Sequence, residues 1–138
     1  KHPQLNVADL VLDIAKTSAD IVVITGGEPL MHNLGKLTNV LHAAGLSTHI
    51  ETSGAHPLSG NWDWICLSPK KFKAPLADIL PLAHELKIVV FNASDFAWAE
   101  KYAAMVSPGC KLYLQPEWDK ASTVTPLIID YIKAHPQW

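Results

Sequence analysis

Short apolar runs alternate with amphipathic segments along the whole chain, and this alternation constrains the fold more than any other feature. Strand-like runs, several of them rich in Val or Ile, are expected at Ile21–Thr25, Ser47–Ile50, Trp64–Leu67, Leu86–Phe91 and Lys111–Leu114. Segments with apolar residues at helical spacings of three and four are expected at Val7–Thr17, Leu34–Ala44, Pro75–His84, Phe96–Val106 and Thr125–His135. The alternation predicts parallel strands joined by crossovers, in an α/β barrel or a doubly wound sheet. Runs this apolar suit strands covered on both faces.

Composition narrows the class of protein. The chain has 138 residues, of which 49% are hydrophobic and 17% charged, as expected for one globular domain. Its formal net charge of -2 gives no basic footprint, so neither nucleic acid nor an anionic membrane is an expected partner. The apolar runs are too short to cross a bilayer, and no signal-peptide pattern is present. We therefore expect a cytoplasmic protein with a small-molecule substrate.

Polar residues follow each expected strand. In parallel α/β folds the carboxyl ends of the strands meet at one rim, where the chemistry is placed. Each polar turn alone is typical of a surface loop, but their shared position predicts a ligand crevice. The turns are Thr25-Gly26-Gly27-Glu28-Pro29, Glu51-Thr52-Ser53-Gly54, Ser68-Pro69-Lys70-Lys71, Asn92-Ala93-Ser94-Asp95 and Gln115-Pro116-Glu117-Trp118.

The glycine-rich turn carries a recognisable motif. Taken alone, residues 26–29 are also compatible with a strand-terminating turn that bears a solvated acid. The string Ile24-Thr25-Gly26-Gly27-Glu28-Pro29-Leu30 resembles the GGEP motif of radical S-adenosylmethionine enzymes, which contacts the methionine ammonium of the cofactor. Residues 49–54, 64–70 and 114–118 resemble later strand ends of 7-carboxy-7-deazaguanine synthases. This second resemblance covers nearly all of the chain.

The resemblance implies a fold and a set of site residues. The fold would be a partial radical-SAM-type open barrel of parallel strands, a single partial domain over residues 1–138, with the first strand and the C-terminal segment outside the chain. Thr25 would contact the substrate, and Lys70 would neutralise the cofactor's carboxylate. Glu28 is expected to serve the cofactor rather than the fold, and Glu51 to accept from the ribose hydroxyls. The expected cofactor-binding residues are Gly26, Gly27, Glu28, Glu51, Ser53, Ser68, Pro69, Lys70, Gln115, Pro116, Glu117 and Trp118.

The resemblance also implies a reaction. The family converts 6-carboxy-5,6,7,8-tetrahydropterin into 7-carboxy-7-deazaguanine with loss of ammonia, a carbon–nitrogen lyase step of queuosine and 7-deazapurine biosynthesis. It uses S-adenosyl-L-methionine, a [4Fe-4S] cluster and Mg²⁺. Cys66 and Cys110 are the only cysteines and are expected to be small buried hydrophobes. The catalytic, cluster and magnesium ligands are therefore expected outside this chain, which alone would be inactive. A homodimer and a flavodoxin-like electron donor are the expected partners.

Three other functions are compatible with the sequence. The nearest is another radical S-adenosylmethionine enzyme, such as an activase of a glycyl-radical protein. A second is an α/β-barrel lyase that uses Lys70 as a Schiff-base amine, because desolvation would depress its pKa. A third is a non-catalytic binding module. Lys71 and Lys73 are expected to be solvated surface residues.

Overall fold

The computed structural model describes residues 5–138, so Lys1 and the three residues after it lie outside the description. A single parallel sheet forms the centre of the fold, and its strand order follows the chain. The strands are β1 (Ile21–Ile24), β2 (Ser47–Thr52), β3 (Trp64–Leu67), β4 (Glu85–Val90) and β5 (Lys111–Pro116). The α-helices are α1 (Val7–Ile14), α2 (Gly35–Ala43), α3 (Asp95–Ala103) and α4 (Ala121–Ala134). The predicted α/β fold with parallel strands is confirmed.

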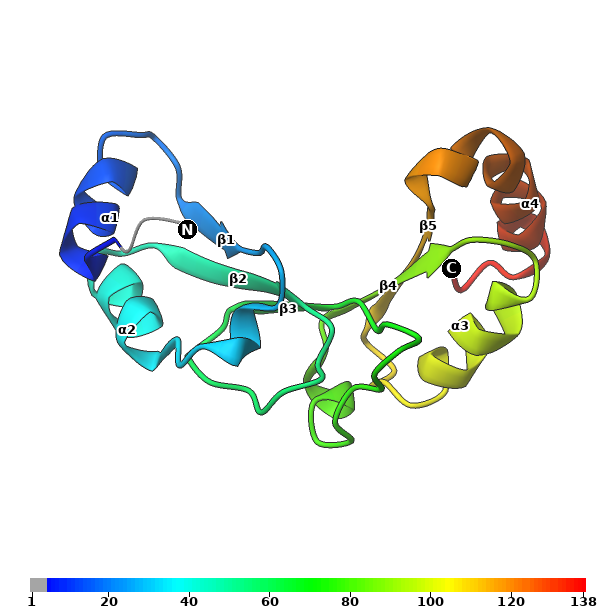
Figure 1. The fold of residues 1–138 in the computed structure, drawn as a ribbon, viewed down its shortest axis with the longest axis horizontal. Helices are drawn as coiled ribbons and strands as arrows, with labels where there is room; N and C mark the ends of the chain where they lie inside the picture. The colour runs from blue at the N-terminus through cyan, green and yellow to red at the C-terminus, as the bar shows by residue number, and fades with distance from the viewer. Residues whose placement is uncertain (1–4) are drawn as a thin grey trace.

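The sheet curves into an open arc with all four helices on its outer side (Figure 1). α1 and α2 lie at the β1 end, and α3 and α4 lie at the β5 end. Neighbouring strands are aligned in register, with Ile24 opposite Ile50 and Val89 opposite Gln115. The carboxyl ends of the strands therefore meet along one rim of a half-open barrel.

The hydrophobic core lies between the convex face of the sheet and the helices. Side chains alternate along a strand, and in β4 the buried positions are Leu86, Ile88 and Val90, all of them 0% exposed. Val124 and Ile128 of α4 belong to the same core. Burial of one such side chain stabilises the fold by about 1.5–3 kcal/mol, so this convex layer holds the sheet in its curved shape.

The concave face of the sheet is not covered by a second layer among residues 5–138. On the edge strand β1, Ile21 and Val23 are 49% and 52% exposed, and Tyr113 of β5 is 47% exposed. The expectation that the strands are covered on both faces is therefore wrong for this part of the chain. The concave positions of the inner strands are largely polar, including Glu51, Glu85 and Lys87, which suits a face that meets ligand or water.

The helix expected over Pro75–His84 is also wrong. The segment forms turns and one short 3-10 helix, η2 (Leu80–Leu82), with i to i+3 bonds such as Leu82 N to Ile79 O at 3.0 Å. A regular helix would require Pro81 to donate to the carbonyl of Ala77, and proline has no N–H. The missing N–H of Pro81 thus outweighs the helical spacing of the apolar residues.

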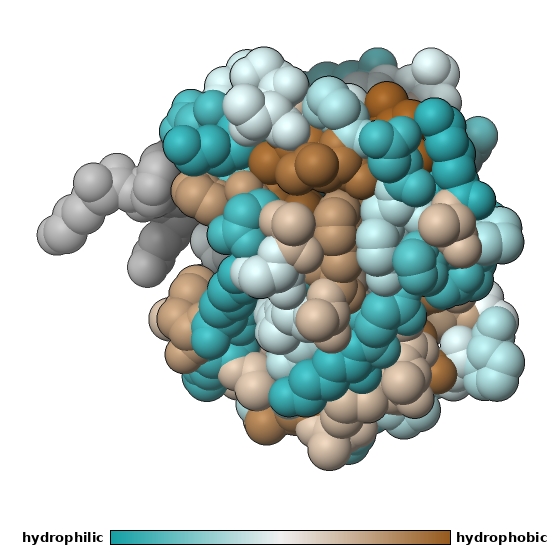
Figure 2. All heavy atoms as spheres, turned by 90° about the vertical axis from the view of Figure 1, so that its right-hand side faces the viewer, coloured by the Kyte–Doolittle hydropathy of each residue, from teal (hydrophilic) through white to brown (hydrophobic). Residues whose placement is uncertain are grey.

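The outer face at the β5 end keeps some apolar surface. Figure 2 shows apolar side chains among hydrophilic ones on the side of the molecule that carries α3 and α4. Leu127 and Ile129 of α4 are 43% and 44% exposed. The helix as a whole begins at Ala121, earlier than expected, and includes Pro126. No helix within residues 5–138 has the length and apolar character needed to span a membrane.

Candidate functional site

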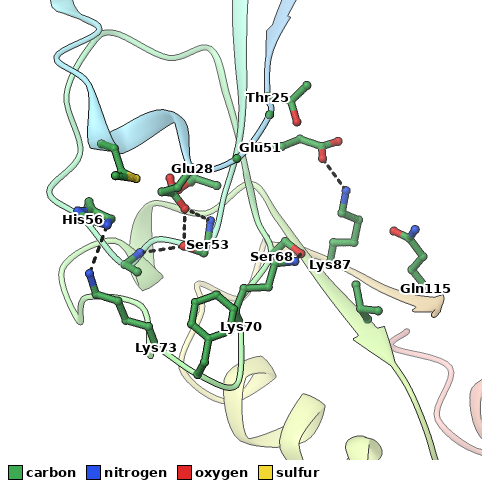
Figure 3. A pocket seen from close by; sticks show the side chains of 17 residues that line it. Thr25, Glu28, Glu51, Ser53, His56, Ser68, Lys70, Lys73, Lys87 and Gln115 are labelled. Atoms are coloured by element: carbon green, nitrogen blue, oxygen red, sulfur yellow. Dashed lines mark hydrogen bonds and ion pairs between the residues drawn. The ribbon is translucent and has the colours of Figure 1, made fainter. Parts of the chain in front are cut away.

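A cavity of about 440 Å³ opens on the concave side where the strands end. Ligand pockets in proteins commonly have volumes of about 300–1,000 Å³. Turns that lie far apart in the sequence contribute to it, as the common rim predicts (Figure 3). The predicted residues that line it are Thr25, Gly26, Gly27, Glu28, Glu51, Ser53, Ser68, Lys70 and Gln115.

The two glycines of the first turn have different roles. Gly26 has a φ of 109°, in the region that side chains other than hydrogen rarely adopt. Gly27 has no positive φ, and a Cβ added there would meet nothing within 4 Å. Neither backbone conformation nor packing among the described residues therefore requires glycine at position 27, which leaves bare backbone beside the cavity.

The Glu28 carboxylate ties the first turn to the second. Its Oε1 accepts from Leu30 N at 3.1 Å and from the Thr52 hydroxyl at 2.5 Å. Its Oε2 accepts from Ser53 N at 2.8 Å and from the Ser53 hydroxyl. Burial raises the pKa of Glu28, but the hydrogen bonds from Ser53, Thr52 and Leu30 outweigh it and hold the pKa below its ordinary value. Glu28 thus serves the fold; a direct contact with a cofactor stays a prediction.

The second turn packs onto the core through Gly54. Its φ is 71°, and a Cβ there would lie 2.6 Å from Leu67 Cδ1 and 3.0 Å from Pro75 Cβ. Leu67 is 0% exposed, so it has little room to move. The requirement for glycine at this position comes from the fold, in contrast to Gly27.

Lys70 and Ser68 line the cavity beyond β3. Lys70 Nζ donates to Ser68 Oγ at 3.1 Å. Burial lowers the pKa of Lys70, and the nearby ammonium of Lys87 lowers it further. The only hydrogen-bond partner of this ammonium within residues 5–138 is a hydroxyl, so an anionic ligand group would be a better partner.

An ion pair crosses the floor of the cavity. Lys87 of β4 donates from Nζ to Glu51 Oε2 of β2 at 2.8 Å, across the intervening strand β3 (Figure 3). The Lys87 side chain is 20% exposed and that of Glu51 is 42% exposed. Burial lowers the pKa of Lys87, but its bond to Glu51 and the neighbouring acidic groups raise it above its ordinary value. Lys87 is thus held charged inside the cavity.

Sequence reasoning missed several lining residues. The alternation of Glu85 and Lys87 with apolar residues of β4 was a usable signal for Lys87, because it places them on the concave face. Lys73, expected on the solvated surface, is exposed but lines the cavity, with its Nζ 3.2 Å from His56 Nε2. The missed residues are Met31, Thr52, Ala55, His56, Phe72, Lys73, Lys87 and Val89.

Lys71 is exposed, as expected, but it is not a free surface charge. It forms an ion pair with Asp95, which is 1% exposed and also accepts from Phe91 N at 2.7 Å. Burial raises the pKa of Asp95, and the bonds from Lys71 and from the backbone of Phe91 and Asn92 overcome this and lower it. This pair holds the turn between β4 and α3.

Some predicted site residues lie away from the main cavity. Pro69 lines a smaller adjacent cavity of about 260 Å³, which shares Lys70 with the first. Pro116 ends β5, and the carboxylate of Glu117 accepts from Lys120 N at 3.1 Å to cap a short helical turn. Trp118 is 89% exposed. The structure thus brings Gln115 to the cavity but not the three residues after it.

The two cysteines are free. Cys66 is buried on β3, as expected, and donates to Glu85 Oε1 at 3.3 Å; burial and the Glu85 charge raise its pKa to about 12. Cys110 was also expected to be buried, but it is only half-buried and lies just before β5; burial raises the pKa of its thiol. Metal clusters require thiolates, so these two protonated thiols do not fit an iron–sulfur cluster. Within the described part of the chain, no group of three or more His, Cys, Asp or Glu could hold a metal ion.

Comparisons with known proteins give one consistent answer. The chain is 47% identical to 7-carboxy-7-deazaguanine synthase of Flavobacterium psychrophilum and 50% identical to that of Synechocystis, in each case over 99% of this chain and 65% of the relative. It is 34% identical to the Prochlorococcus marinus protein of the same name, over 99% of this chain and 72% of the relative. No protein-family model matches.

The fold agrees with a solved structure. The chain superimposes on the crystal structure of QueE from Escherichia coli with a TM-score of 0.83 and 32% sequence identity, over 96% of this chain and 61% of that one. The chain thus spans just under two thirds of the length of the Escherichia coli protein and of the Flavobacterium and Synechocystis relatives.

Proposed function

The chain belongs to the 7-carboxy-7-deazaguanine synthase family, and from that premise we propose that the whole protein converts 6-carboxy-5,6,7,8-tetrahydropterin into 7-carboxy-7-deazaguanine with loss of ammonia. It would do so as a radical S-adenosylmethionine lyase of queuosine biosynthesis. The observation that carries the proposal is the cavity of about 440 Å³ at the strand ends, where the glycine turn, Ser68, Lys70 and Gln115 converge.

The cavity suits S-adenosylmethionine, a molecule with an ammonium, a carboxylate and a polar nucleoside. Gly27 offers backbone without a Cβ to the methionine end, and Lys70 offers a positive charge to its carboxylate. The hydroxyl of Ser68 and the amide of Gln115 can bond to polar groups of the nucleoside. Bound in this cavity, the cofactor would supply the radical that begins the reaction.

The residues of this chain would bind and orient, while the iron–sulfur cluster and Mg²⁺ would be held by other residues. Two thiols with raised pKa values do not provide cluster ligands, and among residues 5–138 no group of three or more His, Cys, Asp or Glu could hold a metal ion. Glu28 and Asp95 keep the turns after β1, β2 and β4 in place. A pre-shaped rim of this kind would align the substrate with the cofactor.

The partners of the whole protein are proposals that follow from the family. They are a pterin substrate, a second copy in a homodimer, and a flavodoxin-like electron donor, in the cytoplasm. The net charge of -2 gives no support for a nucleic-acid partner.

The test is an activity assay on the anaerobically reconstituted whole protein. With S-adenosylmethionine, a reductant and 6-carboxy-5,6,7,8-tetrahydropterin, we expect 7-carboxy-7-deazaguanine in the mass spectrum, together with an equal amount of released ammonia. Formation of 5′-deoxyadenosine only with a glycyl-radical protein would favour the activase instead. Borohydride trapping of a carbonyl substrate on Lys70, whose pKa is lowered by burial, would favour the Schiff-base lyase.

A further inference from the structure

The floor of the cavity contains charged side chains whose roles differ from those of the rim. Glu51 and Lys87 lie within their strands, whereas Gly27, Ser68 and Lys70 lie in turns after the strands end. Glu51 pairs with Cys66 of β3 and Lys87 with Tyr113 of β5, so the sheet holds the backbone under this pair. The pair is therefore a rigid feature of the floor.

Glu51 has acceptor capacity that the fold does not use. Its Oε2 accepts from Lys87 Nζ at 2.8 Å, and no hydrogen bond from residues 5–138 reaches its other oxygen. An ionised carboxylate has about four lone-pair positions. With 42% of its side chain exposed into the cavity, Glu51 can accept further N–H or O–H donors from a ligand.

Lys87 has a different environment. Its ammonium is 20% exposed and bonds to no described residue other than Glu51. Cys66 of β3 lies opposite Glu51 of β2 and Glu85 of β4 in the sheet. Its thiol donates to Glu85, so it does not compete with Lys87 for the Glu51 carboxylate. The ammonium therefore holds the direction of the Glu51 carboxylate.

The position of Glu51 favours one part of the ligand. Ile24 pairs with Ile50, so Thr25 and Glu51 lie next to each other, and Figure 3 shows them side by side with Gln115 beyond Lys87. Thr25 is the expected substrate contact, whereas the expected cofactor contacts lie on the rim. A pterin carries a 2-amino group beside a ring N–H, two parallel donors that match a carboxylate as a guanidinium does.

We propose that Lys87 is a positioning residue that holds the Glu51 carboxylate toward the ligand, and that Glu51 accepts the N–H donors of the aminopyrimidinone edge of the pterin. This inference rests on the proposed function. It reassigns Glu51 from the ribose, its expected partner, to the substrate. Other titratable groups around the pair are Glu28, His49, Cys66, Lys70, Glu85 and Tyr113.

The experiment measures binding of two probes to the reconstituted whole protein by calorimetry, namely S-adenosylmethionine and then 6-carboxypterin, a stable oxidised analogue of the substrate. We expect Lys87→Met and Glu51→Gln each to weaken pterin binding about ten- to a hundredfold, as expected for loss of a charge-assisted bond, and to leave S-adenosylmethionine binding within about twofold. Lys87→Arg should restore most of the pterin affinity. Lys133→Met, in an exposed pair with Asp130 on α4, is the matched control.

A double variant separates positioning from simple packing. If Lys87 acts by holding the Glu51 carboxylate toward the ligand, Lys87→Met should add little to the loss of pterin affinity that Glu51→Gln already causes. Two independent effects would add instead, and additive losses would refute the positioning role. If Lys87→Met does not fold, Lys87→Arg and Glu51→Gln decide the question.

Other outcomes would overturn the inference in distinct ways. Loss of S-adenosylmethionine affinity in place of pterin affinity would return Glu51 to the ribose. Pterin binding equal to wild type in both single variants would refute the positioning role while leaving the proposed function intact. A wild-type protein that binds S-adenosylmethionine but not the pterin would refute the inference together with the proposed function.

Discussion

The Glu28 carboxylate provides the sharpest test of how the site is built. In Glu28→Ala the donors of Leu30, Thr52 and Ser53 lose their acceptor. Thr52 is 3% exposed, so its hydroxyl loses a partner in a dry environment at a cost of about 1–3 kcal/mol, whereas half-buried Ser53 can recruit water and costs less. We expect the free energy of unfolding to fall by about 2–5 kcal/mol in total. This is less than the sum of the separate bonds, because neighbouring donors in one network do not contribute additively.

The assay is thermal unfolding of the whole protein followed by circular dichroism. A loss of this size should lower Tm by roughly 6–20 °C for a domain of this length. Asp130→Ala, which removes an exposed carboxylate of α4, should leave Tm nearly unchanged and serves as control. A Tm of Glu28→Ala equal to wild type, beside a large loss of cofactor affinity, would show that Glu28 serves the ligand rather than the fold.

The pH dependence of this effect has a definite sign. The pKa of Glu28 is lower in the folded protein than its ordinary value of 4.5. Its stabilisation is therefore fully present above the unfolded pKa and is lost as the pH falls through the folded pKa. The difference in stability between wild type and Glu28→Ala should be constant near neutral pH and shrink in acid.

Three further predictions follow from the cavity and the strands. Gly27→Ala should weaken S-adenosylmethionine binding with little change in Tm, whereas Gly54→Ala should lower Tm, because its Cβ would lie 2.6 Å from Leu67 Cδ1. Lys70→Met should raise the dissociation constant of S-adenosylmethionine about ten- to a hundredfold in calorimetry; an unchanged value would place the carboxylate elsewhere. Cys66 should resist iodoacetamide at about pH 8 in the folded protein and react after denaturation, because its pKa is about 12; rapid alkylation of the folded protein would contradict the buried environment.

Much of the fold was predictable because the spacing of apolar residues and the place of the turns between them can be read directly from the sequence. The β3 bounds Trp64–Leu67 were predicted correctly, and the other strands were placed within two residues at either end. The segment Pro75–His84 was misread because its apolar spacing is helical, while the decisive fact is the missing N–H of Pro81. The spacing of apolar residues alone does not show whether one missing backbone hydrogen bond costs more than the apolar contacts that a helix would gain.

The site residues that follow strands were largely predictable from the sequence. Those that depend on the path of the chain after a strand, or on which face of the sheet is open, were not. Residues directly after β1, β2 and β3 reached the cavity, because parallel strands bring their ends together. The turn after β4, residues 92–95, was expected at the same crevice but does not line this cavity. Pro116 ends β5 and Glu117 and Trp118 follow it directly, yet none of the three lines the cavity, because the chain enters a short helical turn there. Lys87 was overlooked because its strand was treated as buried on both faces, and only the curvature of the sheet shows that the concave face is open.

Because side chains alternate along the strands, the residues that support the core and the residues that face the cavity can change independently. On β4, Leu86, Ile88 and Val90 support the core, while Lys87 and Val89 face the cavity between them. Substitutions at the second set leave the core contacts unchanged, so a new ligand preference can arise without a new scaffold. A mutant library confined to the cavity-facing positions of β2 and β4 should therefore yield mostly folded proteins with diverse binding, whereas the same library moved by one residue should yield mostly unfolded ones.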